Sequence, residues 1–70
     1  MDSVMNIASE AMLDNVQEAN ELAQKIADPE NGMDDIEKNI VKLHETENSF
    51  KANAIVIETA DEMLDTLLKL

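Results

Sequence analysis

The sequence predicts an all-α protein, an antiparallel two-helix hairpin with a coiled-coil seam that self-associates into a helical bundle. Its 70 residues contain one Gly and one Pro, and both lie in the segment 28–32. The stretches on either side have no helix breaker and carry apolar residues at seven-residue spacing. Because a chain this short, with no cysteine and one aromatic residue, cannot build a large internal core, we expect partners to contribute to its stability.

The whole chain, residues 1–70, is interpreted as a single helical-hairpin domain. The first helix is expected over about residues 2–27, which are rich in Ala, Glu, Gln, Leu and Met. Its apolar stripe is a seven-residue series, Met5, Met12, Ala19 and Ile26, flanked by Ala8, Val16, Leu22 and Ala23. The alanines in this stripe are small enough to let a partner helix approach closely.

The turn is expected over residues 28–33. Pro29 fixes its own φ angle and disfavours helical geometry at the residue before it. The pair Asn31-Gly32 tolerates positive φ, so the chain is expected to reverse here.

The second helix is expected over about residues 34–69, with Asp34 as a candidate N-cap. One seven-residue series, predicted to form the seam, runs through Ile36, Leu43, Phe50, Ile57 and Leu64. The companion row is assigned to Ile40, Glu47, Ala54, Asp61 and Leu68, four residues further on. This helix should extend about 15 Å past the first, and the overhang would need a partner.

The composition excludes several function classes. A net charge of −11 repels phosphate backbones and anionic lipid headgroups, so nucleic-acid binding is not expected. The longest unbroken apolar run, Ala54 to Ile57, is far short of the roughly 20 residues that a membrane helix needs, so membrane insertion is not expected either. The single histidine, His44, lies three residues before Glu47, but zinc sites need more His or Cys than the chain has. We therefore expect no metal, no cofactor and no catalytic residues, and hence no enzyme.

The segment 49–70 carries a more specific pattern. An aromatic residue is followed at fixed spacings by Ala-Asn, by Val, by Thr-Ala-Asp and by Met-Leu with a further Leu. The residues are Phe50, Ala52, Asn53, Val56, Thr59, Ala60, Asp61, Met63, Leu64 and Leu67. In this pattern the chain resembles the bacterial flagellar rod and hook proteins, the axial proteins of the flagellum. The first helix resembles their amino-terminal helix more weakly.

The resemblance implies a structural or accessory subunit of the flagellar rod or hook that acts by helix packing. It implies a location in the basal body, reached by export without a cleaved signal. The expected partners are further copies of the chain, as a homo-oligomer, or other flagellar axial proteins. The candidate assembly residues are Phe50, Asn53, Ala54, Ile57, Thr59, Asp61, Leu64 and Leu68. The polar members among them could fix register by requiring hydrogen-bond partners.

An alternative function remains open at this point. The same helices could form a cytoplasmic, acidic hairpin that acts as an adaptor or as a chaperone-like binding module for a flagellar subunit. A hairpin or dimeric four-helix bundle would show the same apolar stripe.

Overall fold

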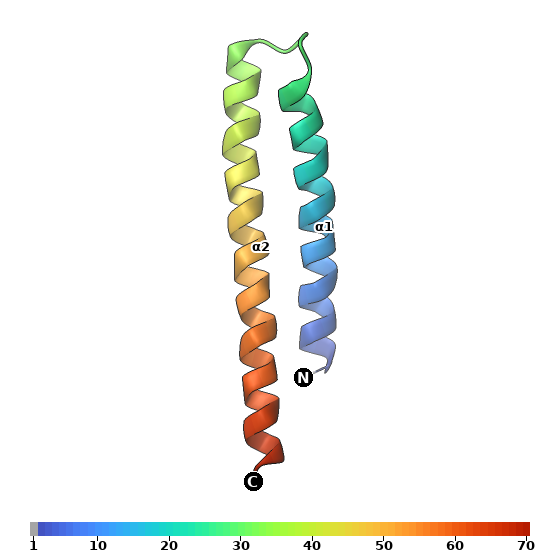
Figure 1. Ribbon diagram of the computed structural model, residues 1–70, viewed down its shortest axis with the longest axis vertical. Coiled ribbons are helices and arrows are strands. Elements are labelled where there is room, and N and C mark those ends of the chain that lie inside the picture. The colour runs from blue at the N-terminus through green and yellow to red at the C-terminus, as the bar shows by residue number, and fades with distance from the viewer. Residues whose placement is uncertain (1) are drawn as a thin grey trace.

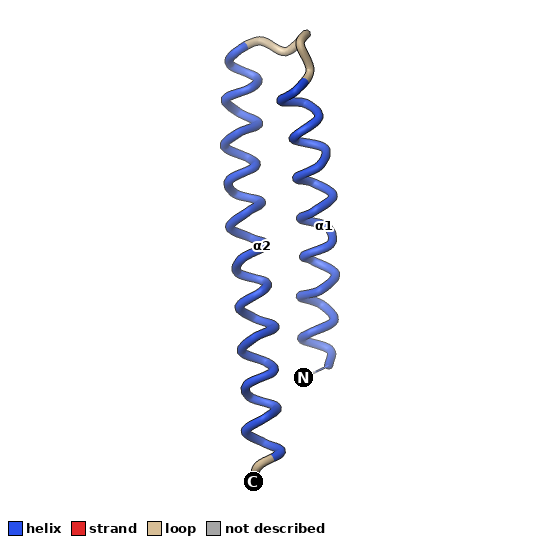
Figure 2. Tube along the Cα trace, in the orientation of Figure 1, coloured by secondary structure: helices blue, strands red, loops and turns tan. Residues whose placement is uncertain are grey.

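The computed structural model describes residues 2–70 and contains two helices joined by a short turn (Figure 1). Helix α1 spans Asp2–Ala27 and helix α2 spans Met33–Leu68. They lie side by side and antiparallel in a rod whose Cα atoms extend over 59 × 15 × 12 Å (Figure 2). The predicted all-α hairpin is confirmed. Within residues 2–70, neither helix is both long and apolar enough to cross a membrane.

The turn is closed by hydrogen bonds around Asp28. The backbone N–H of Asn31 donates to the Asp28 carbonyl at 3.2 Å, and the N–H of Glu30 donates to the Asp28 carboxylate at 2.9 Å. The Asn31 side chain donates to the Lys25 carbonyl, which ties the turn to the end of α1. Positive φ is not used, since Gly32 has φ −78° and ψ 169°. The predicted N-cap was wrong: Gly32 occupies that position without a side-chain cap, and Asp34 lies in the first turn.

The inward face of each helix follows a heptad pattern. In α1 the side chains that are buried or half-buried are Met5, Ala8, Ala11, Met12, Asn15, Ala19, Leu22 and Ile26. In α2 they are Ile36, Asn39, Leu43, Thr46, Asn53, Ala54, Ile57, Ala60 and Leu64. Apart from Ala11 and Ala54, and with Phe50 at 36% exposure counted between Thr46 and Asn53, these positions alternate by three and four residues, which is coiled-coil spacing.

The predicted second row of α2 needs correction. The inward residues lie three positions after the main series, at Asn39, Thr46, Asn53 and Ala60. Of the five residues assigned to that row, Ala54 is half-buried, while Ile40, Glu47, Asp61 and Leu68 are exposed. The inward row is therefore small and polar, and the larger apolar side chains at the neighbouring positions face solvent.

The hairpin consequently has a thin core. Among the described residues only Ala8, Leu22, Thr46 and Ala60 are buried, and Leu22 is the one large apolar side chain in this group. The Thr46 hydroxyl finds its hydrogen-bond partner within α2, since it donates to the Lys42 carbonyl at 2.9 Å. Figure 1 also shows α2 extending past the amino-terminal end of α1, as expected. Much of the apolar surface of this chain is thus left uncovered by its own fold.

Candidate helix-packing interface

The structure divides the eight candidate assembly residues into two sets. Asn53, Ala54, Ile57 and Leu64 are half-buried on the side of α2 that faces α1. These four therefore belong to the α1–α2 interface of the hairpin. The other four are exposed to different degrees and remain available for a partner: Phe50, Thr59, Asp61 and Leu68.

Asn53 makes the polar link between the helices. Its Nδ2 donates to the Oδ1 of Asn15 on α1, at 3.3 Å, in a partly buried position. This hydrogen bond forms only when the two asparagines lie at one height along the rod. The sequence pattern predicts Asn53 as a register-setting polar residue for assembly, and in the structure its partner lies within the hairpin.

Phe50 lies at the edge of the interface, with 36% of its surface exposed. It lines a groove of about 400 Å³ together with Leu43, Val16 and Ala19. Asn15, Thr46 and Glu47 complete the lining. The phenyl ring therefore contacts the hairpin on one side and leaves an apolar surface open on the other.

Thr59 and Met63 line a second groove, of about 300 Å³, at the open end of the hairpin. Val4 of α1 and Ile55 and Val56 of α2 form its remaining large apolar walls. Beyond this groove the helix overhang carries Leu67, Leu68 and Leu70, of which Leu68 is 78% exposed. An overhang of three exposed leucines is the kind of surface that marks a protein interaction site.

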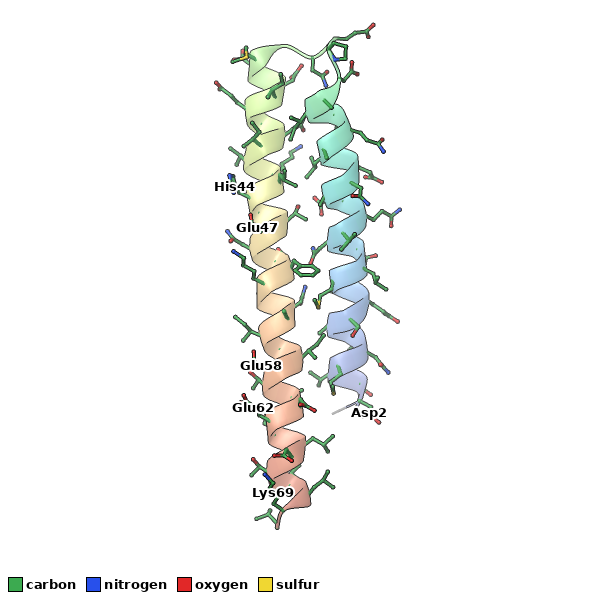
Figure 3. The ribbon with its side chains drawn as sticks, viewed as in Figure 1. Asp2, His44, Glu47, Glu58, Glu62 and Lys69 are labelled. Atoms are coloured by element: carbon green, nitrogen blue, oxygen red, sulfur yellow. The ribbon has the colours of Figure 1, made fainter. Side chains whose placement is uncertain are left out.

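Several charged side chains of α2 lie on its outer faces. Figure 3 shows His44, Glu58 and Glu62 pointing outward from α2, whereas Glu47 borders the groove beside α1. Glu47 Oε1 lies 3.0 Å from the Lys51 ammonium, and its Oε2 lies 3.8 Å from His44 Nδ1. Within residues 2–70, no three His, Cys, Asp or Glu side chains cluster closely enough to hold a metal ion.

The Lys51 ammonium, hydrogen-bonded to Glu47 and attracting its charge, holds the pKa of Glu47 below its ordinary value. A lowered pKa means that this pair stabilises the helix at neutral pH and loses its effect as pH falls through the Glu47 pKa. Because both groups are exposed, the contribution is small.

We expect Lys51→Met to raise the pKa of Glu47 toward its ordinary value, since the substitution removes both the hydrogen bond and the positive charge. A carboxyl-detected NMR titration measures this directly. Lys69→Met serves as the control, because Lys69 pairs with Asp65 and should leave Glu47 unaffected. An unchanged Glu47 pKa in the Lys51 variant would contradict the assigned pairing.

Sequence reasoning missed five inward residues as parts of the interface: Ala11, Asn15, Asn39, Thr46 and Ala60. For all but Ala11 the signal was present, because each lies three residues after a member of a seven-residue series, at Met12, Ile36, Leu43 and Ile57 respectively. Polar side chains at such positions are discounted by a search for apolar residues, although hydrogen bonds allow Asn15 and Thr46 to be tolerated there.

Comparison with known families identifies the second half of the chain. The sequence model described as "Flagellar basal body rod FlgEFG protein C-terminal" matches residues 35–70, which are half of the chain and nearly all of α2. The match confirms the resemblance that the pattern in residues 50–67 indicates. No curated protein and no solved structure matches the chain.

Proposed function

The chain belongs to the family of flagellar basal body rod proteins, and from this premise we propose that it is a non-enzymatic structural subunit of the flagellar rod or hook that assembles through helix packing. The observation that carries the proposal is the family match over residues 35–70. Those residues form the helix whose outer surface the hairpin leaves uncovered.

The distribution of apolar surface supports this role. A hairpin that functions as a monomer would keep its large apolar side chains between the two helices. Here Ile55, Met63 and Leu67 are each more than half exposed, and all three lie in the family-matched helix. Subunits of a packed array need such surface, because neighbouring helices cover it after assembly.

The proposed location is the basal body, reached through the flagellar export apparatus without removal of a signal sequence. The partners are further copies of this chain or other axial proteins. The net charge of −11 keeps single copies apart by mutual repulsion, which favours solubility before assembly.

Purification of basal bodies from cells that carry an epitope-tagged chain tests the proposal. We expect the tagged chain in the basal-body fraction in several copies per structure. Leu22→Ala, which removes the one large apolar side chain that is buried among residues 2–70, should abolish its incorporation and so controls for nonspecific carry-over. A chain found instead in the cytosol, in a one-to-one complex with a flagellar subunit, would contradict the proposal and favour a chaperone-like function.

A further inference from the structure

Each helix of the hairpin carries a second stripe of uncharged side chains outside the helix interface. The line on α1, called the α1 stripe, consists of Asn6, Ser9, Leu13, Val16, Asn20 and Ala23. Leu13, Val16 and Ala23 are apolar, and the other three are polar but uncharged. These residues again alternate by three and four, so they form one continuous line along the helix. All six are exposed. The acidic residues of α1 between Asn6 and Ala23 lie on its other faces: Glu10, Asp14, Glu18 and Glu21.

The carboxy-terminal half of α2, together with the last residue of the chain, carries a matching line, the α2 stripe. It consists of Ala52, Val56, Thr59, Met63, Thr66 and Leu70, which follow the same alternating spacing and are also all exposed. The charged residues beyond Ser49 lie at other positions: Lys51, Glu58, Asp61, Glu62, Asp65 and Lys69. A chain with net charge −11 thus keeps two lines free of charge over most of the length of α1 and over the second half of α2.

The two stripes lie on opposite sides of the hairpin. Val16 of the α1 stripe borders the groove that contains Phe50 and Glu47. Val56 and Met63 of the α2 stripe border the other groove, with Val4. Each helix has one seven-residue inward series, which starts at Met5 in α1 and at Ile36 in α2. In an antiparallel coiled coil, the residues four positions after members of these series lie on one side of the helix pair, and the residues one position before them lie on the other side. Val16 and Glu47 belong to the first set, and Val4, Val56 and Met63 belong to the second.

We propose that the α1 stripe of one copy packs against the α2 stripe of the next copy, so that the chain assembles head to tail. This inference rests on the proposed structural role and names the partner, a second copy, and the surfaces by which copies join. Two different surfaces on opposite sides define a heterologous contact, and repetition of such a contact produces a ring or an open array.

Charge and size favour a second copy as the occupant. A basic partner would bind the acidic faces, which are the faces that the two stripes avoid. An acidic copy of the same chain can approach closely only where charge is absent, and the stripes provide that surface twice. The small residues Ser9 and Ala23 on the α1 stripe leave room for larger ones such as Met63 on the α2 stripe.

Coverage of both stripes favours an array over a closed dimer. A symmetric dimer through one stripe would leave the other stripe exposed. In an array each copy makes two contacts, one through each stripe, so both stripes are covered.

Charge insertion into one stripe at a time tests the proposal. Leu13→Glu blocks the α1 stripe and Met63→Glu blocks the α2 stripe; both side chains are exposed, at 70% and 51% in the hairpin, so folding should survive. Val41→Glu is the matched control, because Val41 is 57% exposed and lies outside both stripes. Sedimentation of each purified chain over a hundredfold range of concentration gives its oligomeric state.

We expect wild type and Val41→Glu to form species larger than dimers, and each blocked variant to associate about tenfold or more weakly. An equimolar mixture of the two blocked variants should form a one-to-one dimer and nothing larger, because each retains the surface that the other lacks. This rescue also shows that both variants are folded.

Other outcomes overturn the proposal. Either blocked variant dimerising alone would mean that the remaining stripe packs against itself. A wild-type chain that stays monomeric throughout would exclude assembly by these surfaces. Incorporation into basal bodies is measured separately, so the head-to-tail contact can fail while the structural role still holds.

Discussion

Replacement of Leu22 by alanine should destabilise the hairpin by about 2 to 4 kcal/mol and leave much of the chain unfolded in dilute solution. Leu22 is 4% exposed and is the only large apolar side chain in the buried core of the described residues. Leucine-to-alanine changes at such sites cost about 2 to 5 kcal/mol, and a small domain has only about 5 to 15 kcal/mol of stability in total.

Leu13 on the same helix provides a matched control, because Leu13→Ala makes the same chemical change at a side chain that is 70% exposed. That variant should change the free energy of unfolding by less than about 0.5 kcal/mol. Urea denaturation followed by circular dichroism, at concentrations too low for association, measures both. Equal midpoints for the two variants would mean that the α1–α2 interface does not determine the stability of the chain.

The two helices and their antiparallel arrangement could be predicted from sequence because each depends on a strong local signal. The Pro29 to Gly32 segment breaks the chain once, and the series from Ile36 to Leu64 keeps one face of α2 apolar through five heptads. Both signals concern single helices and survive without knowledge of the partner. The packed hairpin therefore follows from them almost directly.

The second inward row of α2 could not be predicted in the same way. A heptad permits a companion either three or four residues after each member of the main series, and in α2 the apolar choices Ile40 and Leu68 favour four. In the structure the companion row lies three residues after the main series, because the turn fixes which face of α2 meets α1 and because Asn53 has a hydrogen-bond partner across the interface. Such pairing depends on two distant residues, so periodicity within one helix does not reveal it.

The candidate assembly residues could likewise be predicted only in part, because they divide between the α1–α2 interface and the outer surface. The sequence pattern in residues 50–67 selected residues for a single interface, yet Asn53 and Leu64 face α1 while Thr59 faces outward. One helix with apolar or uncharged residues on two faces can serve both the hairpin and a neighbour. The pattern therefore combines two sets of constraints, which only the three-dimensional arrangement separates.

Replacement of both asparagines by leucine, in the Asn15→Leu, Asn53→Leu double variant, should raise the stability of the hairpin by about 2 to 4 kcal/mol. The wild-type hydrogen bond is long, at 3.3 Å, and contributes about 1 kcal/mol or less. Two leucines at half-buried inward positions add apolar burial and remove the cost of desolvating two amides. By contrast, Asn53→Ala alone should cost about 1 kcal/mol, since it leaves the Asn15 amide without its partner.

The gain in stability should be accompanied by a loss of alignment. With the asparagine pair gone, the inward apolar residues, which repeat every seven positions on both helices, can interlock again after α1 slips by one heptad along α2. Ala8 and Ala60 report on this slip: each lies one heptad from the asparagine pair, on the same side of it, so they share one height in the wild-type alignment. Both are 3% exposed.

Thiols introduced by Ala8→Cys and Ala60→Cys would be the only ones in the chain, which has no cysteine of its own. Mild oxidation should cross-link them efficiently when the asparagines are present, and less completely in the double leucine background, where slipped hairpins place the thiols too far apart. Thermal denaturation without these thiols measures the stability change. A double leucine variant less stable than wild type, or one that cross-links as completely, would show that Asn15 and Asn53 do not act as the register-setting pair. Stability that rises as cross-linking falls is the combined result expected if this polar contact trades stability for a single alignment of the helices.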